Sequence, residues 1–127
     1  MSSFSDYLEN AVLDHVFRNT ALASPTTVYL ALYTVTPSDS GGGTEVTGGG
    51  YARQAITFGA ASGGAMTSTA AVTFTASGAN FGTVVAVGIH DAASAGNLLA
   101  WDGITSAAVN DGDTIEFATG DIDLTLT

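Results

Sequence analysis

The sequence predicts an all-β fold: an antiparallel β-sandwich, of jelly-roll or immunoglobulin-like type, preceded by one amphipathic helix. Beyond about residue 26, short segments alternate apolar and polar side chains, and turn-forming Gly, Pro and Asp residues separate them. The pattern lacks the alternating strands and helices that build a parallel nucleotide-binding sheet. A length of 127 residues is typical of one domain, so we expect residues 1–127 to form a single β-sandwich domain.

The one predicted helix covers residues 4–18, FSDYLENAVLDHVFR. Its apolar residues recur at the i, i+3, i+4, i+7 spacing of one helix face. Ser5 is the expected N-cap, and Asp6 lies in the first turn, where the helix dipole favours negative charge. The apolar face either covers the sheet of its own domain or docks on a neighbouring subunit. For the second interpretation the predicted interface residues are Tyr7, Leu8, Val12, Val16 and Phe17, with Arg53 from the β region.

Seven or so strands are predicted after Ser24-Pro25. The first is apolar on both faces, so we expect a central strand that is buried on both sides, one of them under the helix. The last places Ile122, Leu124 and Leu126 on one face in strict period two. Asp102-Gly103 and Asp111-Gly112 are expected turns. The predicted strands span 27–34, 51–58, 66–75, 83–91, 97–103, 113–118 and 121–127.

Charged side chains are scarce, at 11% of the chain against a usual share of about 25%. Twelve acidic residues face only Arg18 and Arg53, which gives a formal net charge of −10. Nucleic acid is therefore excluded as a partner, because its binding requires cations that neutralise phosphates, and anionic membranes would repel the chain. A neutral surface of Ser, Thr, Gly and Ala suits packing against copies of itself or other subunits, although it also fits a small domain with a mild exterior.

The chain contains no cysteine, which excludes disulfides, a thiolate nucleophile and cysteine metal ligands. The N-terminal segment MSSFSDYLEN has no basic region and no long apolar run. We therefore expect no signal peptide and no membrane span, and a soluble protein made in the cytoplasm.

The segment GGGTEVTGGGYARQ, residues 41–54, contains two triple-glycine runs. A phosphate-binding loop would lead from a strand into a helix and would usually carry a Lys. Here the glycines lead into a strand pattern and the chain has no Lys, so we expect a mobile loop that simply connects strands, with ordering against a neighbouring subunit as the alternative. Arg53 is predicted to pair with a carboxylate, either within the domain or across a subunit interface.

No catalytic, cofactor or metal site is predicted. His15, on the helix, is expected to be partly buried and hydrogen-bonded. His90-Asp91 could imitate a base with its orienting carboxylate, but no Ser lies in a Gly-x-Ser-x-Gly context. Trp101 is expected in the core. The aspartates that invite a calcium interpretation lack the spacing of a calcium loop, and we expect them in turns or on a solvent-facing strand: Asp111, Asp113, Asp121 and Asp123.

Several segments carry a family resemblance over nearly the whole chain: DYLEN…LDHVF, YLALYT, GGGYARQ, FGAASGG, GTVVAVGIHDAASAGNLLAW and GDTIEFATGDIDLTL. In this order they resemble small tailed-phage proteins that are usually labelled tail-fibre or virion structural proteins. The resemblance implies a non-enzymatic β-sandwich that is built into a virion and has no catalytic motif.

The resemblance, the sparse charge and the apolar helix favour a repeated structural subunit. Such a subunit would decorate or cement the capsid or build the tail, and would bind virion proteins and its own copies. The alternative is a receptor-binding module at the tail tip. A third class, a hydrolase of cell-wall or capsule polymer, would pair two carboxylates across a cleft, which a single sequence neither shows nor excludes.

Overall fold

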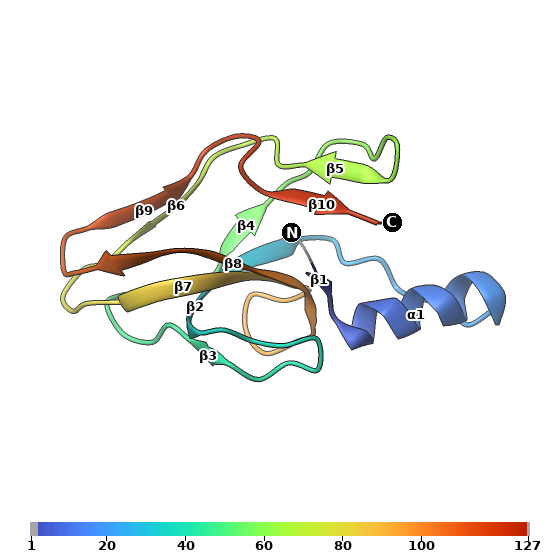
Figure 1. Ribbon diagram of the computed structural model, residues 1–127, viewed down its shortest axis with the longest axis horizontal. Coiled ribbons are helices and arrows are strands. Elements are labelled where there is room, and N and C mark those ends of the chain that lie inside the picture. The colour runs from blue at the N-terminus through green and yellow to red at the C-terminus, as the bar shows by residue number, and fades with distance from the viewer. Residues whose placement is uncertain (1–2, 127) are drawn as a thin grey trace.

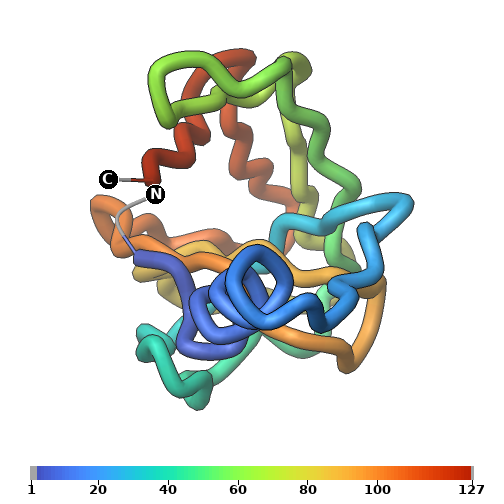
Figure 2. The backbone as a smooth tube through the Cα atoms, turned by 90° about the vertical axis from the view of Figure 1, so that its right-hand side faces the viewer, coloured from blue at the N-terminus to red at the C-terminus, as the bar shows by residue number. Residues whose placement is uncertain are grey.

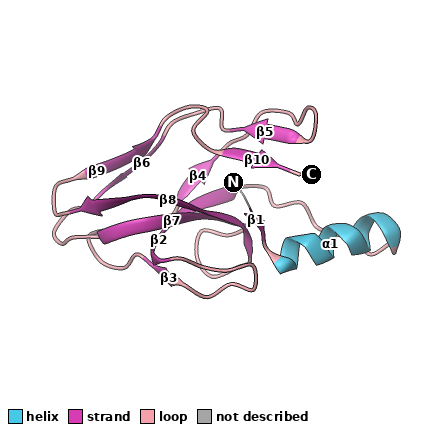
Figure 3. Cartoon of the chain, viewed as in Figure 1, coloured by secondary structure: helices cyan, strands magenta, loops and turns pink. Residues whose placement is uncertain are grey.

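The computed structural model describes residues 3–126 and is mostly β, with one helix near the N-terminus (Figures 1 and 3). This confirms the predicted fold class. The elements are β1 (Ser3–Phe4), α1 (Asp6–Phe17), β2 (Val28–Val35), β3 (Thr44–Glu45), β4 (Gln54–Ile56), β5 (Ala65–Thr67), β6 (Val72–Thr75), β7 (Gly82–His90), β8 (Leu98–Val109), β9 (Thr114–Phe117) and β10 (Asp123–Thr125).

The strands form two layers in which all pairings are antiparallel. The main sheet has the order β1-β8-β7-β2-β3, and β4 pairs with the same strand β2 as β3 does. Two ribbons, β5–β10 and β6–β9, lie above this sheet and form the second layer (Figures 1 and 2). The described chain is therefore a sandwich with one continuous layer and one divided layer.

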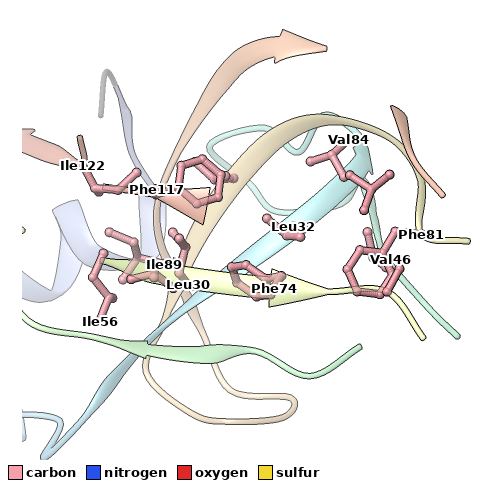
Figure 4. Close-up of a cluster of buried hydrophobic side chains, with 14 residues drawn as sticks. Leu30, Leu32, Val46, Ile56, Phe74, Phe81, Val84, Ile89, Phe117 and Ile122 are labelled. Carbon is pink, nitrogen blue, oxygen red and sulfur yellow. The ribbon is translucent and has the colours of Figure 1, made fainter. Parts of the chain in front are cut away.

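The core lies between the layers. Leu30 and Leu32 of β2 are fully buried there and meet Phe74 of β6 and Phe117 of β9 (Figure 4). The rings of Phe74 and Phe117 meet edge to face, with centroids 6.5 Å apart. Each buried side chain of this size contributes about 1.5–3 kcal/mol through removal of apolar surface from water.

Strand β2 is buried on both faces, as predicted. Leu30 and Leu32 face the core, whereas Ala31 and Tyr33 on the opposite face are 0% and 4% exposed. The expectation that the helix covers this second face is wrong. Side chains and loops next to β3 and the β7–β8 connection cover it instead, as described for the site below.

Helix α1 projects from one end of the sandwich rather than lying across a sheet (Figure 1), and Figure 2 looks along it. None of its residues is buried. The interpretation in which its apolar face covers the domain's own sheet is therefore wrong. The helix begins at Asp6, later than predicted, because Phe4 belongs to β1 and pairs with Ala100 of β8.

Ser5 anchors the β1–α1 arm and is the N-cap, as predicted. Its side chain is 2% exposed, accepts a hydrogen bond from the Leu8 N–H at 3.2 Å and donates one to the Leu98 carbonyl at 2.5 Å. Its own N–H donates to the Leu99 carbonyl at 2.8 Å. A buried polar side chain with satisfied partners therefore holds the helix to the sheet.

Two strand predictions are wrong for local reasons. Asp102-Gly103 is not a turn: both residues lie within β8, which continues to Val109 and pairs with β7. The predicted strand 66–75 is divided, because the backbone at Ser68 leaves one ribbon for the other. The buried Ser68 hydroxyl accepts hydrogen bonds from the N–H groups of Gly120 and Ile122 at 3.2 and 3.3 Å.

The last strand and the turns agree with prediction in part. Ile122 is buried and Leu124 packs against the core, but Leu126 is 60% exposed, because regular pairing ends at Thr125. Asp111-Gly112 forms the predicted turn, with Gly112 at φ +89°.

We predict that Ser5→Ala loosens the β1–α1 arm. The substitution removes the N-cap and leaves the half-buried Leu98 carbonyl without its side-chain donor, at a cost of about 1–2 kcal/mol. Hydrogen–deuterium exchange should show faster exchange of the first-turn amides of α1. The matched control is Ser77→Ala, at an exposed residue between β6 and β7, which should leave that exchange unchanged; equal exchange in both variants would contradict the anchor.

Candidate functional site

The main polar cluster lies on the outer face of the main sheet, and we call it the Glu45–Arg53 network: Tyr33, Glu45, Tyr51, Arg53 and His90. β3 supplies Glu45, directly opposite Tyr33 on β2. Arg53 immediately precedes β4. Because β3 and β4 pair with the same edge of β2, their polar side chains meet above the second face of that strand.

The centre of the network is a bidentate ion pair. Arg53 Nε lies 2.9 Å from Glu45 Oε2, and Arg53 Nη2 lies 2.9 Å from Glu45 Oε1. The Nη1 group donates to the carbonyls of Ala92 and Ala95, at 2.9 and 2.8 Å. The Arg53 side chain is only 8% exposed. One guanidinium thus joins β3, the start of β4 and the β7–β8 loop.

Tyr51 fills the gap in the edge of β2 between β3 and β4. Its hydroxyl accepts a hydrogen bond from the Leu32 N–H at 3.0 Å and donates one to Glu45 Oε2 at 2.6 Å. Its ring reaches into the core, where it stacks on Phe74 and meets the edge of Phe81. Tyr51 therefore links the hydrophobic core to the ion pair and satisfies a backbone donor.

His90 is a buried neutral member of the network. Its Nε2 lies 2.6 Å from the Tyr33 hydroxyl, and the two rings are stacked. Burial, followed by the positive charge of Arg53, lowers the pKa of His90 to about 4. Burial, followed by the charge of Glu45, raises the pKa of Tyr33 to about 12. Both groups are therefore uncharged near pH 7, and His90 Nδ1 has no hydrogen-bond partner among the described residues.

The carboxylate of Glu45 stays ionised despite its partial burial. Burial alone would raise its pKa, but the hydrogen bonds from Arg53 and Tyr51 outweigh that effect, and the pKa lies below its usual value. The ion pair also raises the pKa of Arg53. The network thus contains one hydrogen-bonded ion pair and neutral aromatic partners. This arrangement stabilises the fold.

The network does not assemble a catalytic base. Asp91 does not orient His90; its carboxylate accepts hydrogen bonds from the N–H and side-chain amide of Asn97, at 2.7 and 2.9 Å. The contact partner of the His90 ring is a tyrosine with a raised pKa rather than a hydroxyl nucleophile. A general base must reach the proton that it abstracts, and here the ring is enclosed.

Within residues 3–126, no group of three or more His, Asp or Glu side chains is placed to hold a metal ion. Three of the aspartates from the calcium interpretation cap turns by accepting backbone N–H hydrogen bonds. Asp111 binds the Gly78 N–H, and the other two accept from residues three positions earlier. The fourth, Asp123, lies on β10 and accepts from the Thr67 hydroxyl. In the two other turns, Asp113 accepts from the Asn110 N–H, and Asp121 accepts from the Ala118 N–H.

The glycine-rich segment does more than connect strands, so that expectation is wrong. It supplies β3, and two of its glycines lie so close to other backbone atoms that a side chain at either position would clash. A Cβ on Gly43, at φ +72°, would lie 2.6 Å from the Val35 carbonyl oxygen, and one on Gly49, at φ +59°, would lie 2.7 Å from that of Ala79. These close approaches bring Glu45 and Tyr51 to their positions around Arg53.

The structure places the predicted interface residues in two different regions. Tyr7, Val16 and Phe17 on α1 are exposed, at 43%, 61% and 77%. Leu8 and Val12 are half-buried. Arg53 is engaged in the network by partners from its own domain, and a part for it at a subunit interface stays a prediction.

Sequence reasoning missed Leu13, Glu45, Tyr51 and Tyr33. Leu13 is 53% exposed and extends the apolar surface of α1. A usable signal existed for Glu45, since it is the one charged residue between the two glycine runs and a scarce arginine follows eight positions later.

Two further expectations are corrected. His15 is exposed rather than partly buried, although its Nδ1 does accept a hydrogen bond from the Leu22 N–H at 3.2 Å. Trp101 is half-buried rather than in the core, because it lies on β8 near the sheet edge, and its indole N–H donates to Asp39 at 2.8 Å.

We predict that Glu45→Ala lowers the free energy of unfolding by about 3 kcal/mol, because it leaves a buried guanidinium without its counter-charge. The double variant Glu45→Ala/Arg53→Met should be less destabilised than Glu45→Ala alone, since the unpaired charge is removed. Urea denaturation measures both. The control is Asp14→Ala, which breaks the exposed Asp14–Arg18 pair and should cost less than about 1 kcal/mol.

A second prediction concerns pH. Because the pKa of His90 falls from 6.5 to about 4 on folding, the unfolded chain binds a proton more readily between these values. The free energy of unfolding should therefore fall as the pH falls, by about 2 kcal/mol between pH 7.5 and 5. The stabilisation from Glu45 is lost only at lower pH, as its carboxylate protonates.

His90→Gln keeps a hydrogen-bonding group for Tyr33 but does not titrate. Chemical denaturation at a series of pH values should show that this variant has lost most of the dependence between pH 7.5 and 5. An unchanged slope would show that another group is responsible.

Comparison with known proteins identifies a family. Residues 3–125 match the family model described as Podophage GP4 fiber I protein gp80. No curated protein matches the chain. Within the described residues, no helix is long and apolar enough to cross a membrane. Since the match covers nearly the whole sequence, the chain belongs to this family of phage fibre proteins and is a virion component.

Proposed function

We propose that this protein is a repeated, non-enzymatic structural subunit of the tail fibre, which binds other virion proteins and further copies of itself. The observation that carries the proposal is the projecting helix α1. Its exposed apolar residues contribute little to the sandwich, whereas a subunit of an assembly would use them at a contact.

The internal network supports the non-enzymatic part of the proposal. Arg53 joins Glu45 of β3 to the β7–β8 loop, and His90 is buried against the Tyr33 hydroxyl. These groups therefore hold loops on the sheet. The scarcity of charge outside the network fits a surface that is desolvated cheaply during assembly.

The family supports the tail over the capsid as the location. A capsid-decorating or cement protein would be compatible with the same small sandwich and the same helix. The family description, however, names a fibre protein, and we therefore place the subunit in the fibre.

A second candidate function is receptor binding, and one recess favours it. A cavity of about 350 Å³ lies between the start of α1, the 39–41 segment and residues 96–98. Tyr7, Asp39, Ser40 and Asn97 line it, and an aromatic ring beside carboxylate and amide groups is a suitable surface for a glycan.

The proposal predicts that quantitative mass spectrometry of purified particles finds far fewer copies than of the major capsid protein. Gold-labelled antibody should bind the tail and not the head. A copy number equal to that of the capsid protein, with label over the head, would contradict a fibre subunit and support decoration.

For receptor binding, the purified protein should compete with phage adsorption to host cells, and Tyr7→Ala/Asp39→Ala should lose that competition. A wild-type protein that leaves adsorption unchanged would remove the second candidate without affecting the first.

A further inference from the structure

The exposed side of helix α1 has two chemically different halves. Asp6, Glu9, Leu13, Val16 and Phe17 are all exposed, and they are separated by the three-, four- and seven-residue steps that place side chains on one helix face. The half near the sandwich carries the two carboxylates. The half at the free end carries Leu13, Val16 and Phe17, which are 53%, 61% and 77% exposed.

The apolar half lies at the end of the molecule that projects furthest from the sheets (Figure 1). We call Leu13, Val16 and Phe17 the helix tip. Exposed large apolar groups on one contiguous surface are unusual in a protein with so few of them elsewhere, and they mark a contact site. The remaining exposed large apolar residues within residues 3–126 are Tyr7 in the first turn of the helix, Val35 at the end of β2 and Leu126 just after β10.

We infer that the helix tip inserts into a concave apolar pocket of a different virion protein, and that this pocket has a basic rim facing Asp6 and Glu9. The inference rests on the proposed function, because it specifies the partner with which the fibre subunit assembles. Two physical arguments select this occupant over a second copy of the chain.

The first argument is area. The three side chains of the tip expose on the order of 300 Å², given that a whole aromatic side chain carries about 150–250 Å². A stable interface between two convex surfaces buries about 800 Å² on each partner. Tip-to-tip contact between two copies is too small for that, whereas a pocket surrounds the tip and buries its flanks as well.

The second argument is charge. In an antiparallel pair of α1 helices, Asp6 and Glu9 of one copy would face the apolar tip of the other and would be desolvated without a cation. In a parallel pair the carboxylates would face their own counterparts. The chain has a net charge of −10, and Arg18 already pairs with Asp14 at 3.1 Å. A basic rim on another protein satisfies both carboxylates.

Co-assembly in infected cells tests the inference. Cells that carry a plasmid-borne variant are infected with the parent phage, so that particles form with the phage-borne wild-type protein. Arg18 and Arg53 are the two tryptic sites, and the peptides 1–18, 19–53 and 54–127 therefore distinguish variant from wild-type protein without a tag. The ratio of variant to wild-type protein in particles is divided by the same ratio in the lysate, and the result is the incorporation ratio.

Leu13→Ser/Phe17→Ser should reduce this incorporation ratio about tenfold or more, because it removes the anchors of the contact. The matched control, Val35→Ser, replaces a residue of similar exposure, 55%, on β2. It should incorporate like plasmid-borne wild-type protein. Thermal unfolding of the purified variants confirms that both are folded before the comparison is made.

Normal incorporation of Leu13→Ser/Phe17→Ser would overturn the inference while leaving the proposed function intact. If particles contained no wild-type protein from either the plasmid or the phage, the proposed function itself would be overturned. Sedimentation of purified protein provides a separate outcome: a dimer that the double variant abolishes would identify a second copy as the occupant and overturn the inference.

The basic rim has its own variant. Glu9→Lys should reduce incorporation, whereas Glu116→Lys, which introduces the same change at an exposed position on β9, should not. Equal incorporation of both would overturn the basic rim.

Discussion

The fold depends on covering the second face of β2, the inner strand of the main sheet that pairs with β7, β3 and β4. Its core face needs only apolar contacts, but its other face carries Tyr33 with no second sheet above it. The Glu45–Arg53 ion pair solves this by drawing the β3 segment and the β7–β8 loop together over that face. Burying an ion pair costs desolvation free energy. Here that cost is offset because both carboxylate oxygens and most guanidinium N–H groups have hydrogen-bond partners.

The general architecture could be predicted from the sequence because it follows from local rules. Alternation identified most strands, and the N-cap at Ser5 follows from residue type. The division of 66–75 and the continuation of β8 through Asp102-Gly103 could not be predicted, because both depend on which distant strand each segment meets. The single-domain boundary stays a prediction.

The site was harder to predict than the fold. A scarce Arg53 suggested a carboxylate partner, and the position of Glu45 between the two glycine runs was a usable signal for it. Nothing in the residue spacing could place Tyr51 between two strands. The helix periodicity was read correctly as amphipathic. The direction of the helix was not predicted correctly, because periodicity shows that an apolar face exists but not what that face contacts. The β1–α1 arm turns outward at Ser5.

The closure of the β2 edge by β3, Tyr51 and β4 has a consequence for crowding. An open edge of a central strand invites another chain to add itself as an extra strand, and a fibre concentrates many subunits in a small volume. Here the Leu32 amide is bound by a tyrosine hydroxyl, and short strands occupy the positions on either side of it. Another chain that approaches this edge can therefore bind only through side chains, because the backbone positions of β2 that would pair with an added strand are already occupied.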